Sequence, residues 1–99
     1  MKGGWVYILC NKPGGVIYIG VTADLARRIW EHRGGRGSLF VRRYGLNLLV
    51  HVEPYPTIEE AIAREKQLKN WHRKWKIDLI EKNNPNWLDI VIDPGSSPG

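Results

Sequence analysis

Two short apolar runs separated by a dense turn signal open this 99-residue chain, and they restrict its fold more than any other feature. Residues 5–10 and 16–20 are rich in β-branched and aromatic side chains, which favour strands. Residues 11–15 between them contain an asparagine, a proline and two glycines. The pattern predicts a β-hairpin at the start of the chain.

The elements after the hairpin follow from capping residues, prolines and apolar spacing. Thr22 or Asp24 can cap a helix that runs to about Arg33. Thr57 and Glu60 form a capping box that opens a second long helix. After the first helix we expect a flexible basic loop over 34–38 and a third strand over 46–53, which Pro54 and Pro56 stop. The second long helix is expected to end near residue 70, and a last helix follows over roughly 73–82.

This order of elements, β-β-α-β-α-α, predicts an α+β fold in which helices flank a small three-stranded antiparallel sheet. The chain is long enough for one such domain, which we expect over residues 1–92. Residues 93–99 consist of proline, glycine, serine and aspartate, which cannot bury apolar surface. We expect them to form a disordered tail.

Composition narrows the class of protein. The longest apolar run, residues 5–10, is far shorter than the ~20 residues of a membrane span, and no signal peptide is recognisable. A single cysteine, Cys10, excludes an internal disulfide and a multi-thiolate zinc site. We therefore expect a cytoplasmic protein without membrane contact. Its net charge of +5 favours a polyanionic partner such as nucleic acid.

Glu65 breaks the pattern of its own helix. Ile58, Ala61, Ile62 and Leu68 have the three-and-four spacing of a buried stripe, and Glu65 falls on that stripe. An inward carboxylate costs several kcal/mol unless it is paired or bound to a metal. Two interpretations remain open at this point, a structural ion pair with an arginine and a metal ligand.

Four further residues are ambiguous one at a time. Arg28 and His32 are four apart and share a face of the first helix, which is also typical of solvated surface. Tyr7 and Tyr18 lie on adjacent predicted strands, where aromatic residues usually belong to the core. Their joint occurrence with Glu65 is more informative than any one of them.

Together these residues resemble the GIY-YIG nuclease superfamily. The likeness consists of a tyrosine in the first strand, the Tyr18-Ile19-Gly20 element in the second, an arginine ten residues later and a helical glutamate. It covers roughly residues 4–82 and is greatest to small single-domain bacterial proteins, which are related to the N-terminal domain of the excinuclease C subunit. The element that corresponds to the GIY signature reads Trp5-Val6-Tyr7 in this chain, which keeps only its tyrosine.

The resemblance implies a metal-dependent endonuclease that hydrolyses phosphodiester bonds in DNA, or alternatively RNA, and leaves 5′-phosphate and 3′-hydroxyl ends. Tyr7 is then the general base, assisted by His32 or by the cationic site, because a free tyrosine with a pKa of ~10 is almost wholly protonated at neutral pH. Tyr18 orients the water or the phosphate. Arg28 stabilises charge, and Glu65 holds a single Mg²⁺ or Mn²⁺.

The expected nucleic-acid contacts are Gly20, Arg27, Arg33, Arg36 and Lys69. A different class of function remains open, a non-catalytic nucleic-acid-binding module in which Trp30 and Phe40 stack on bases. Trp71 and Trp75 continue a helical stripe with Leu68 and are expected in the core. We expect a monomer that uses a protein partner for targeting.

The hairpin register decides whether the two tyrosines belong to one site. A five-residue turn over 11–15 would pair Cys10 with Val16 and place Tyr7 and Tyr18 on opposite faces of the sheet. A shared site therefore requires an even-length loop or a bulge near the two glycines.

Overall fold

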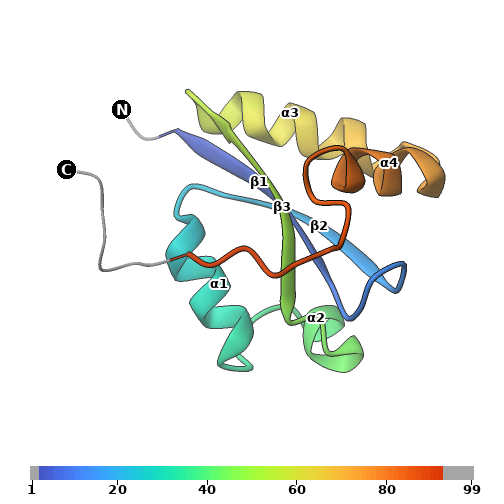
Figure 1. Ribbon diagram of the computed structural model, residues 1–99. Coiled ribbons are helices and arrows are strands. Elements are labelled where there is room, and N and C mark those ends of the chain that lie inside the picture. The colour runs from blue at the N-terminus through green and yellow to red at the C-terminus, as the bar shows by residue number, and fades with distance from the viewer. Residues whose placement is uncertain (1–2, 93–99) are drawn as a thin grey trace.

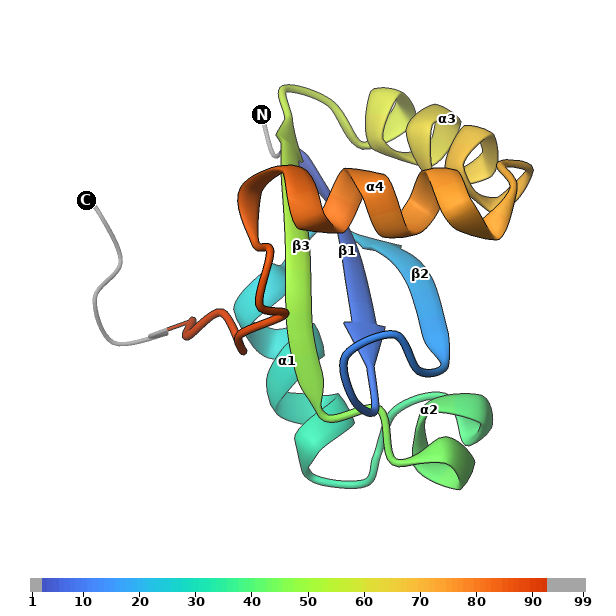
Figure 2. The same cartoon turned by 45° about the vertical axis from the view of Figure 1, so that its right-hand side comes forward.

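One antiparallel sheet lies between two layers of helices in the computed structural model, which describes residues 3–92. The strands β1 (Gly4–Cys10), β2 (Ile17–Thr22) and β3 (Leu48–Tyr55) are arranged in the order β2-β1-β3. Helices α1 (Leu25–Arg33) and α2 (Leu39–Tyr44) lie on one face, and α3 (Ile58–Lys69) and α4 (Arg73–Asn83) lie on the other (Figures 1 and 2). The predicted α+β class is confirmed.

The central strand β1 is buried on both faces, which explains its uninterrupted apolar run. Val6, Ile8 and Cys10 join the core under α3 and α4. Tyr7 and Leu9 point the opposite way and join the core formed with α1 and α2. The alternation of side chains along β1 thus assigns Tyr7 to the α1 face.

The hairpin has the register that a shared tyrosine site requires. Cys10 pairs with Ile17, so the loop consists of the six residues 11–16, an even number. Tyr18 pairs with Leu9, the same-face neighbour of Tyr7, and both tyrosines therefore lie on one face. Inside the loop the Asn11 side chain accepts a hydrogen bond from the Val16 amide at 2.8 Å.

Side-chain caps begin the helices where the sequence predicts them. The Asp24 side chain accepts from the Arg27 amide, and the Thr57 hydroxyl accepts from the Glu60 amide. Helix α2 was not predicted and adds one element to the expected order. Its six residues are delimited by a Ser38 cap and by Gly45, whose φ of 62° is in the left-handed region that favours glycine.

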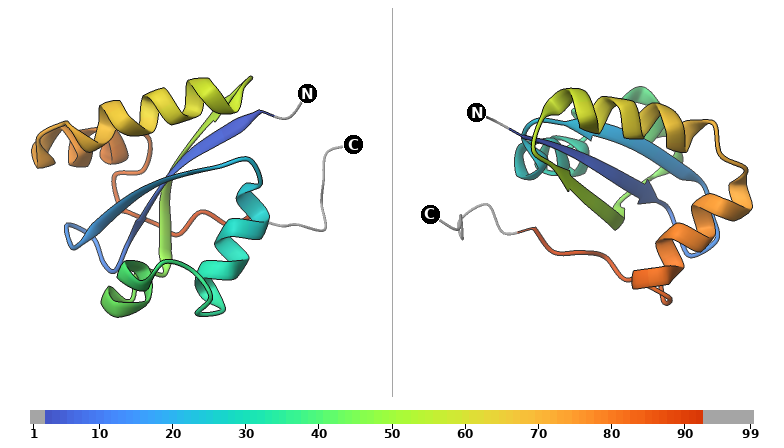
Figure 3. Two further views of the ribbon diagram at one scale, coloured as in Figure 1. Left: turned by 180° about the vertical axis from the view of Figure 1, so that it is seen from behind. Right: turned by 90° about the horizontal axis from the view of Figure 1, so that it is seen from above.

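The prediction that Pro54 ends the third strand is wrong, because β3 continues to Tyr55 with Pro54 opposite Trp5. An edge strand tolerates proline since the missing N–H can face away from the sheet. The segment after α4 then returns to β3 (Figure 3). There the Ile90 amide donates to the Leu49 carbonyl at 2.7 Å, and the Leu49 amide donates to Asp89 at 2.8 Å.

Two apolar side chains expected in the core are exposed instead. Ile62 lies at the solvent edge of α3, and Trp75 of α4 is 52% exposed, whereas Trp87 beyond α4 is buried. The predicted disordered tail, residues 93–99, lies outside the described residues. No helix among residues 3–92 has the length and apolar character that crossing a membrane requires.

Candidate active site

Tyr7, Tyr18 and His32 form a compact cluster between the sheet and α1. Their ring centroids are 5.9 to 6.3 Å apart, and the Tyr7 hydroxyl is hydrogen-bonded to His32 Nε2 at 3.1 Å. Tyr7 is only 1% exposed and His32 5% exposed. The hydroxyl of Tyr7 therefore exchanges its proton only with groups in direct contact.

Two glycines make room for this cluster. Gly20 lies opposite Tyr7 across the ladder, and a Cβ there would overlap Cζ and the hydroxyl of the Tyr7 ring. Gly37, in the loop after α1, lies against His32, and a Cβ there would overlap Nδ1. Gly20, expected as a nucleic-acid contact, is buried and has a steric role in this structure. Gly37 was not identified from the sequence, where it appears only as one of several loop glycines.

The resting site holds its two key groups uncharged. Burial raises the pKa of Tyr7 far above its usual value, Tyr18 and Glu65 add to this, and Arg28 offsets only part of it. Burial lowers the pKa of His32, and Arg28 lowers it further against an opposing effect of Glu31. At neutral pH the pair is thus a phenol beside a neutral imidazole, which is able to accept a proton.

No hydrogen bond to the second ring nitrogen, Nδ1, fixes the tautomer of His32 among residues 3–92. Its Nδ1 is buried and has no hydrogen-bond partner among residues 3–92. A histidine tautomer is normally set by the bond that the other ring nitrogen makes. Without that bond, the ring is able to present either a donor or an acceptor to Tyr7.

Arg28 and Glu65 approach the cluster from opposite helical layers. Arg28 projects from α1, with its Nε 3.8 Å from Glu31, and its charge acts on both Tyr7 and His32. Glu65 projects from α3 with a side chain only 14% exposed, and its carboxylate is 3.0 Å from Lys69 Nζ. The charge of Glu65 also acts on Tyr7. The charges of Arg28 on α1 and of Glu65 on α3 thus both act on Tyr7, which β1 carries.

The inward carboxylate that an arginine neutralises is Glu53, not Glu65. On β3, Glu53 accepts hydrogen bonds from Arg64 at 2.9 Å, from Tyr55 at 2.8 Å and shares one with His51 at 2.8 Å. Burial raises the pKa of Glu53, but these hydrogen bonds outweigh it and lower the pKa to about 2. Among the residues that the structure describes, the partner of Glu65 is a lysine one turn along its own helix.

The oxygen donors of the site suit one weakly held divalent cation. Among residues 3–92 no three His, Cys, Asp or Glu side chains lie close enough to hold a metal ion by themselves. Glu65 supplies a nearly buried carboxylate, which is the ligand type that Mg²⁺ and Mn²⁺ prefer. Such a site completes its coordination with water and with substrate phosphate oxygens.

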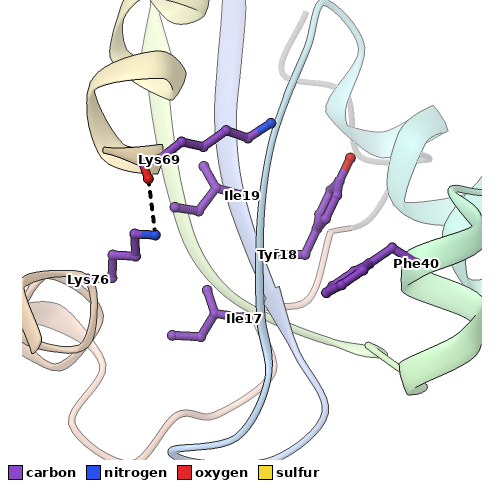
Figure 4. A pocket seen from close by; sticks show the side chains of 6 residues that line it. All are labelled: Ile17, Tyr18, Ile19, Phe40, Lys69 and Lys76. Atoms are coloured by element: carbon purple, nitrogen blue, oxygen red, sulfur yellow. Dashed lines mark hydrogen bonds between the residues drawn. The ribbon is translucent and has the colours of Figure 1, made fainter. Parts of the chain in front are cut away.

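The predicted nucleic-acid contacts separate into two groups. Arg27 lies beside Arg28 at a hollow of about 300 Å³ near the start of α1, and Lys69 lies at a second hollow beside β2 (Figure 4). Arg33 instead binds Asp89 through two hydrogen bonds of 2.8 and 2.9 Å, which fastens the final segment to α1. The Arg36 guanidinium stacks over Trp30 at 5.4 Å.

Comparison with known proteins identifies the family of this chain. The family model of the GIY-YIG catalytic domain matches residues 3–78. A UPF0213 protein of Haloquadratum walsbyi is 35% identical over 79 residues, covering 79% of this chain and 86% of the relative. A UPF0213 protein of Halalkalibacterium halodurans is 38% identical over 76 residues, covering 77% and 80%.

A solved structure has the same fold. The solution NMR structure of a UPF0213 protein from Bacillus halodurans is similar with a TM-score of 0.53 and 34% identity. The likeness covers 83% of this chain and 86% of that protein. The residues matched by the family model, 3–78, include β1, β2, α1 and α3, the elements that carry the tyrosine cluster and Glu65.

Proposed function

Since the chain belongs to the GIY-YIG catalytic domain family, whose fold is that of a nuclease, we propose that it is a metal-dependent endonuclease that hydrolyses phosphodiester bonds in DNA. The observation that carries the proposal is the hydrogen-bonded Tyr7–His32 pair, on which the charges of Arg28 and Glu65 act from two different helices. A structural core has no need of a buried phenol–imidazole pair flanked by an arginine and a carboxylate.

Glu65 is the proposed ligand of the divalent ion. When bound, the ion supplies Lewis-acid polarisation of the phosphoryl group. In its absence, the Glu65 carboxylate is paired with Lys69 at 3.0 Å, so that the part-buried negative charge keeps a partner.

Tyr7 and His32 form the proposed route for the proton of the attacking water. Tyr7 takes that proton on its hydroxyl oxygen as it passes its own proton to His32 Nε2, 3.1 Å away. The raised pKa of Tyr7 disfavours a free phenolate, so the two transfers occur together and His32 ends as the imidazolium. Tyr18, packed against both rings, orients the water or the phosphate.

Arg28 supplies the permanent positive charge of the site. Its guanidinium is the only type of side-chain cation that offers two parallel donors to phosphate oxygens. It stabilises the charge that builds up in the transition state and, together with the larger effect of burial, it lowers the pKa of His32 so that the ring is uncharged before the proton arrives.

The test is cleavage of labelled DNA by the purified protein with Mg²⁺, against a chelator control and the Glu65→Gln variant. Flapped, nicked, single-stranded and duplex substrates are tried in parallel, with RNA as a further arm. We expect chelation and Glu65→Gln each to abolish cleavage, with 5′-phosphate products from the native protein. DNA binding without cleavage of any substrate would favour the non-catalytic binding module.

Tyr7→Phe provides a second variant for the same assay. It removes one buried hydroxyl and is expected to cost about 1 kcal/mol of stability, because the His32 hydrogen bond is lost. Cleavage should fall by orders of magnitude while DNA binding is retained. We further propose that the protein acts as a cytoplasmic monomer and uses a protein partner for targeting.

A further inference from the structure

A hollow of about 350 Å³ straddles the outer edge of β2 beside the tyrosine cluster. Figure 4 shows Tyr18 and Phe40 on one side of the strand and the other lining side chains on the opposite side. Both helical layers therefore border this β2-edge hollow. Its lining residues are Ile17, Tyr18, Ile19, Phe40, Lys69 and Lys76.

We propose that the β2-edge hollow binds one nucleotide of the substrate strand by its sugar and phosphate, next to the nucleotide that is cut and without regard to base sequence. The inference rests on the proposed function, because it takes nucleic acid as the substrate. Tyr18 lines the hollow and also contacts Tyr7 and His32, so the two sites are continuous.

Lys69 and Lys76 give the hollow the charge that a phosphate requires. None of the ion pairs between residues 3–92 includes Lys76, whose Nζ donates only to the Lys69 carbonyl at 3.4 Å. Lys74, two residues earlier on the same helix, is paired with Asp78 at 3.2 Å. Of these two lysines, the one without a carboxylate partner is the one that lines the hollow.

The remaining lining is apolar and suits contact with a nucleotide without readout of its base edge. Ile17, Ile19 and the half-exposed Phe40 ring provide an apolar wall against which deoxyribose carbons pack. Arginine, asparagine, glutamine and the carboxylates, which read base edges through paired hydrogen bonds, are absent from the lining, and we assign its two lysines to phosphate, which lysine binds as a point charge. Contacts to sugar and phosphate position the strand but carry no sequence information.

The first experiment compares Lys76→Gln with Lys74→Gln, a matched change on the same helix. Binding of a fluorescein-labelled DNA oligonucleotide is followed by anisotropy over a salt series, with chelator present so that no cleavage occurs. We expect Lys76→Gln to weaken binding roughly tenfold at low salt and to lower the salt slope by about one. Lys74→Gln should leave the affinity and the salt slope unchanged, and Lys76→Arg should restore binding. Thymine-only and mixed-sequence oligonucleotides should bind with the same affinity.

The second experiment probes the apolar wall through α2. Phe40→Ala and Leu39→Ala both truncate an exposed side chain of that helix, but only Phe40 lines the hollow. Phe40→Ala should weaken binding several-fold, and Leu39→Ala should not. This pair keeps the proposal testable even if changes at Lys76 disturb the fold.

The outcomes separate the two proposals. Suppose that the native protein cleaves DNA, but that Lys76→Gln binds DNA as tightly as Lys74→Gln and Phe40→Ala binds it as tightly as Leu39→Ala. The subsite is then wrong and the nuclease stands. If no substrate is cleaved but Lys76→Gln selectively weakens binding, the hollow stands as a nucleotide-binding site and the nuclease fails. A sequence-dependent effect of Lys76→Gln, or no DNA binding at all, would overturn the subsite.

Discussion

Gly20 lies directly opposite Tyr7 across the β1–β2 ladder, and the Tyr7 ring occupies the space that a Cβ on Gly20 would need. The glycine of the second signature element therefore exists to accommodate the tyrosine of the first. This relationship links strand pairing to the position of the proposed general base, and it suggests the first of five predictions.

Gly20→Ala should displace the Tyr7 ring. We expect cleavage to fall by orders of magnitude and the free energy of unfolding to fall by about 1–3 kcal/mol, as for other overpacked cores. Thermal melting and a cleavage assay measure the two effects. In a Tyr7→Ala background the stability cost of Gly20→Ala should largely vanish, and additive costs would show that the overlap is unimportant.

Gly37→Ala should displace the His32 imidazole. The added methyl group would overlap Nδ1, so the ring must rotate away from the Tyr7 hydroxyl. Cleavage should fall at least as far as in a His32→Asn variant. Gly34→Ala, three residues earlier and with only ordinary contacts around its Cβ, is the control that should stay active. Equal activity of the two glycine variants would remove His32 from the proton route.

The pH dependence of cleavage should follow neutral His32. Burial and Arg28 lower the pKa of its imidazole below the usual value of about 6.5, so the ring stays uncharged in weak acid. Activity should persist below that pH and decline when the lowered pKa is reached. In an NMR titration, Arg28→Gln should raise the pKa of His32. A titration of His32 at or above 6.5 in the native protein would contradict the proposed environment.

Arg27 and Arg28 offer a matched comparison on one helix. Each lies near Glu31, but only Arg28 acts electrostatically on Tyr7 and His32. Arg28→Ala should reduce both DNA affinity and the cleavage rate at saturating DNA. Arg27→Ala should reduce affinity alone. If the two variants had the same rate at saturation, Arg28 would be a binding residue without a role in the transition state.

Glu53→Gln should destabilise the fold without impairing the chemistry, the reverse of Glu65→Gln. It leaves Arg64 with a neutral partner in a half-buried network, at an expected cost of about 3 kcal/mol. Because the pKa of Glu53 is lowered to about 2 in the folded protein, its stabilisation is present above the usual glutamate pKa and is lost as pH falls toward 2.

Melting temperatures between neutral and acid pH measure this contribution. The native protein should lose stability over the acid range, and the Glu53→Gln variant should lose less of it. Cleavage by the folded variant should remain close to native. A parallel loss of stability in both proteins would assign acid unfolding to other carboxylates.

The sequence predicted those parts of the fold that depend on local signals. Asp24 and Thr57 cap their helices through their own side chains, and the alternation along β1 separates Tyr7 from Val6 wherever the strand lies. The shared tyrosine site was predicted only conditionally, and the six-residue loop fulfils the condition.

Features that depend on distant contacts were missed. Pro54 continues a strand because β3 is at an edge, which strand order alone decides. The identity of the arginine-paired carboxylate depended on Arg64 facing β3, and the proximity of Gly37 to His32 depends on the path of a loop. Helix α2 is too short for a periodic pattern, although Ser38 and Gly45 marked its ends.

The outer side of β2 pairs with no strand in the part of the chain that the structure describes, whereas β3 is closed by Pro54 and by the segment that carries Asp89. An open strand edge is a template for edge-to-edge aggregation, and lysines beside it are a common protection. Lys69 and Lys76 stand beside this edge, so we expect them also to oppose strand pairing between copies when no nucleic acid covers it. A catalytically dead variant meant to remain soluble at high concentration should therefore alter Tyr7 or Glu65 and leave both lysines in place.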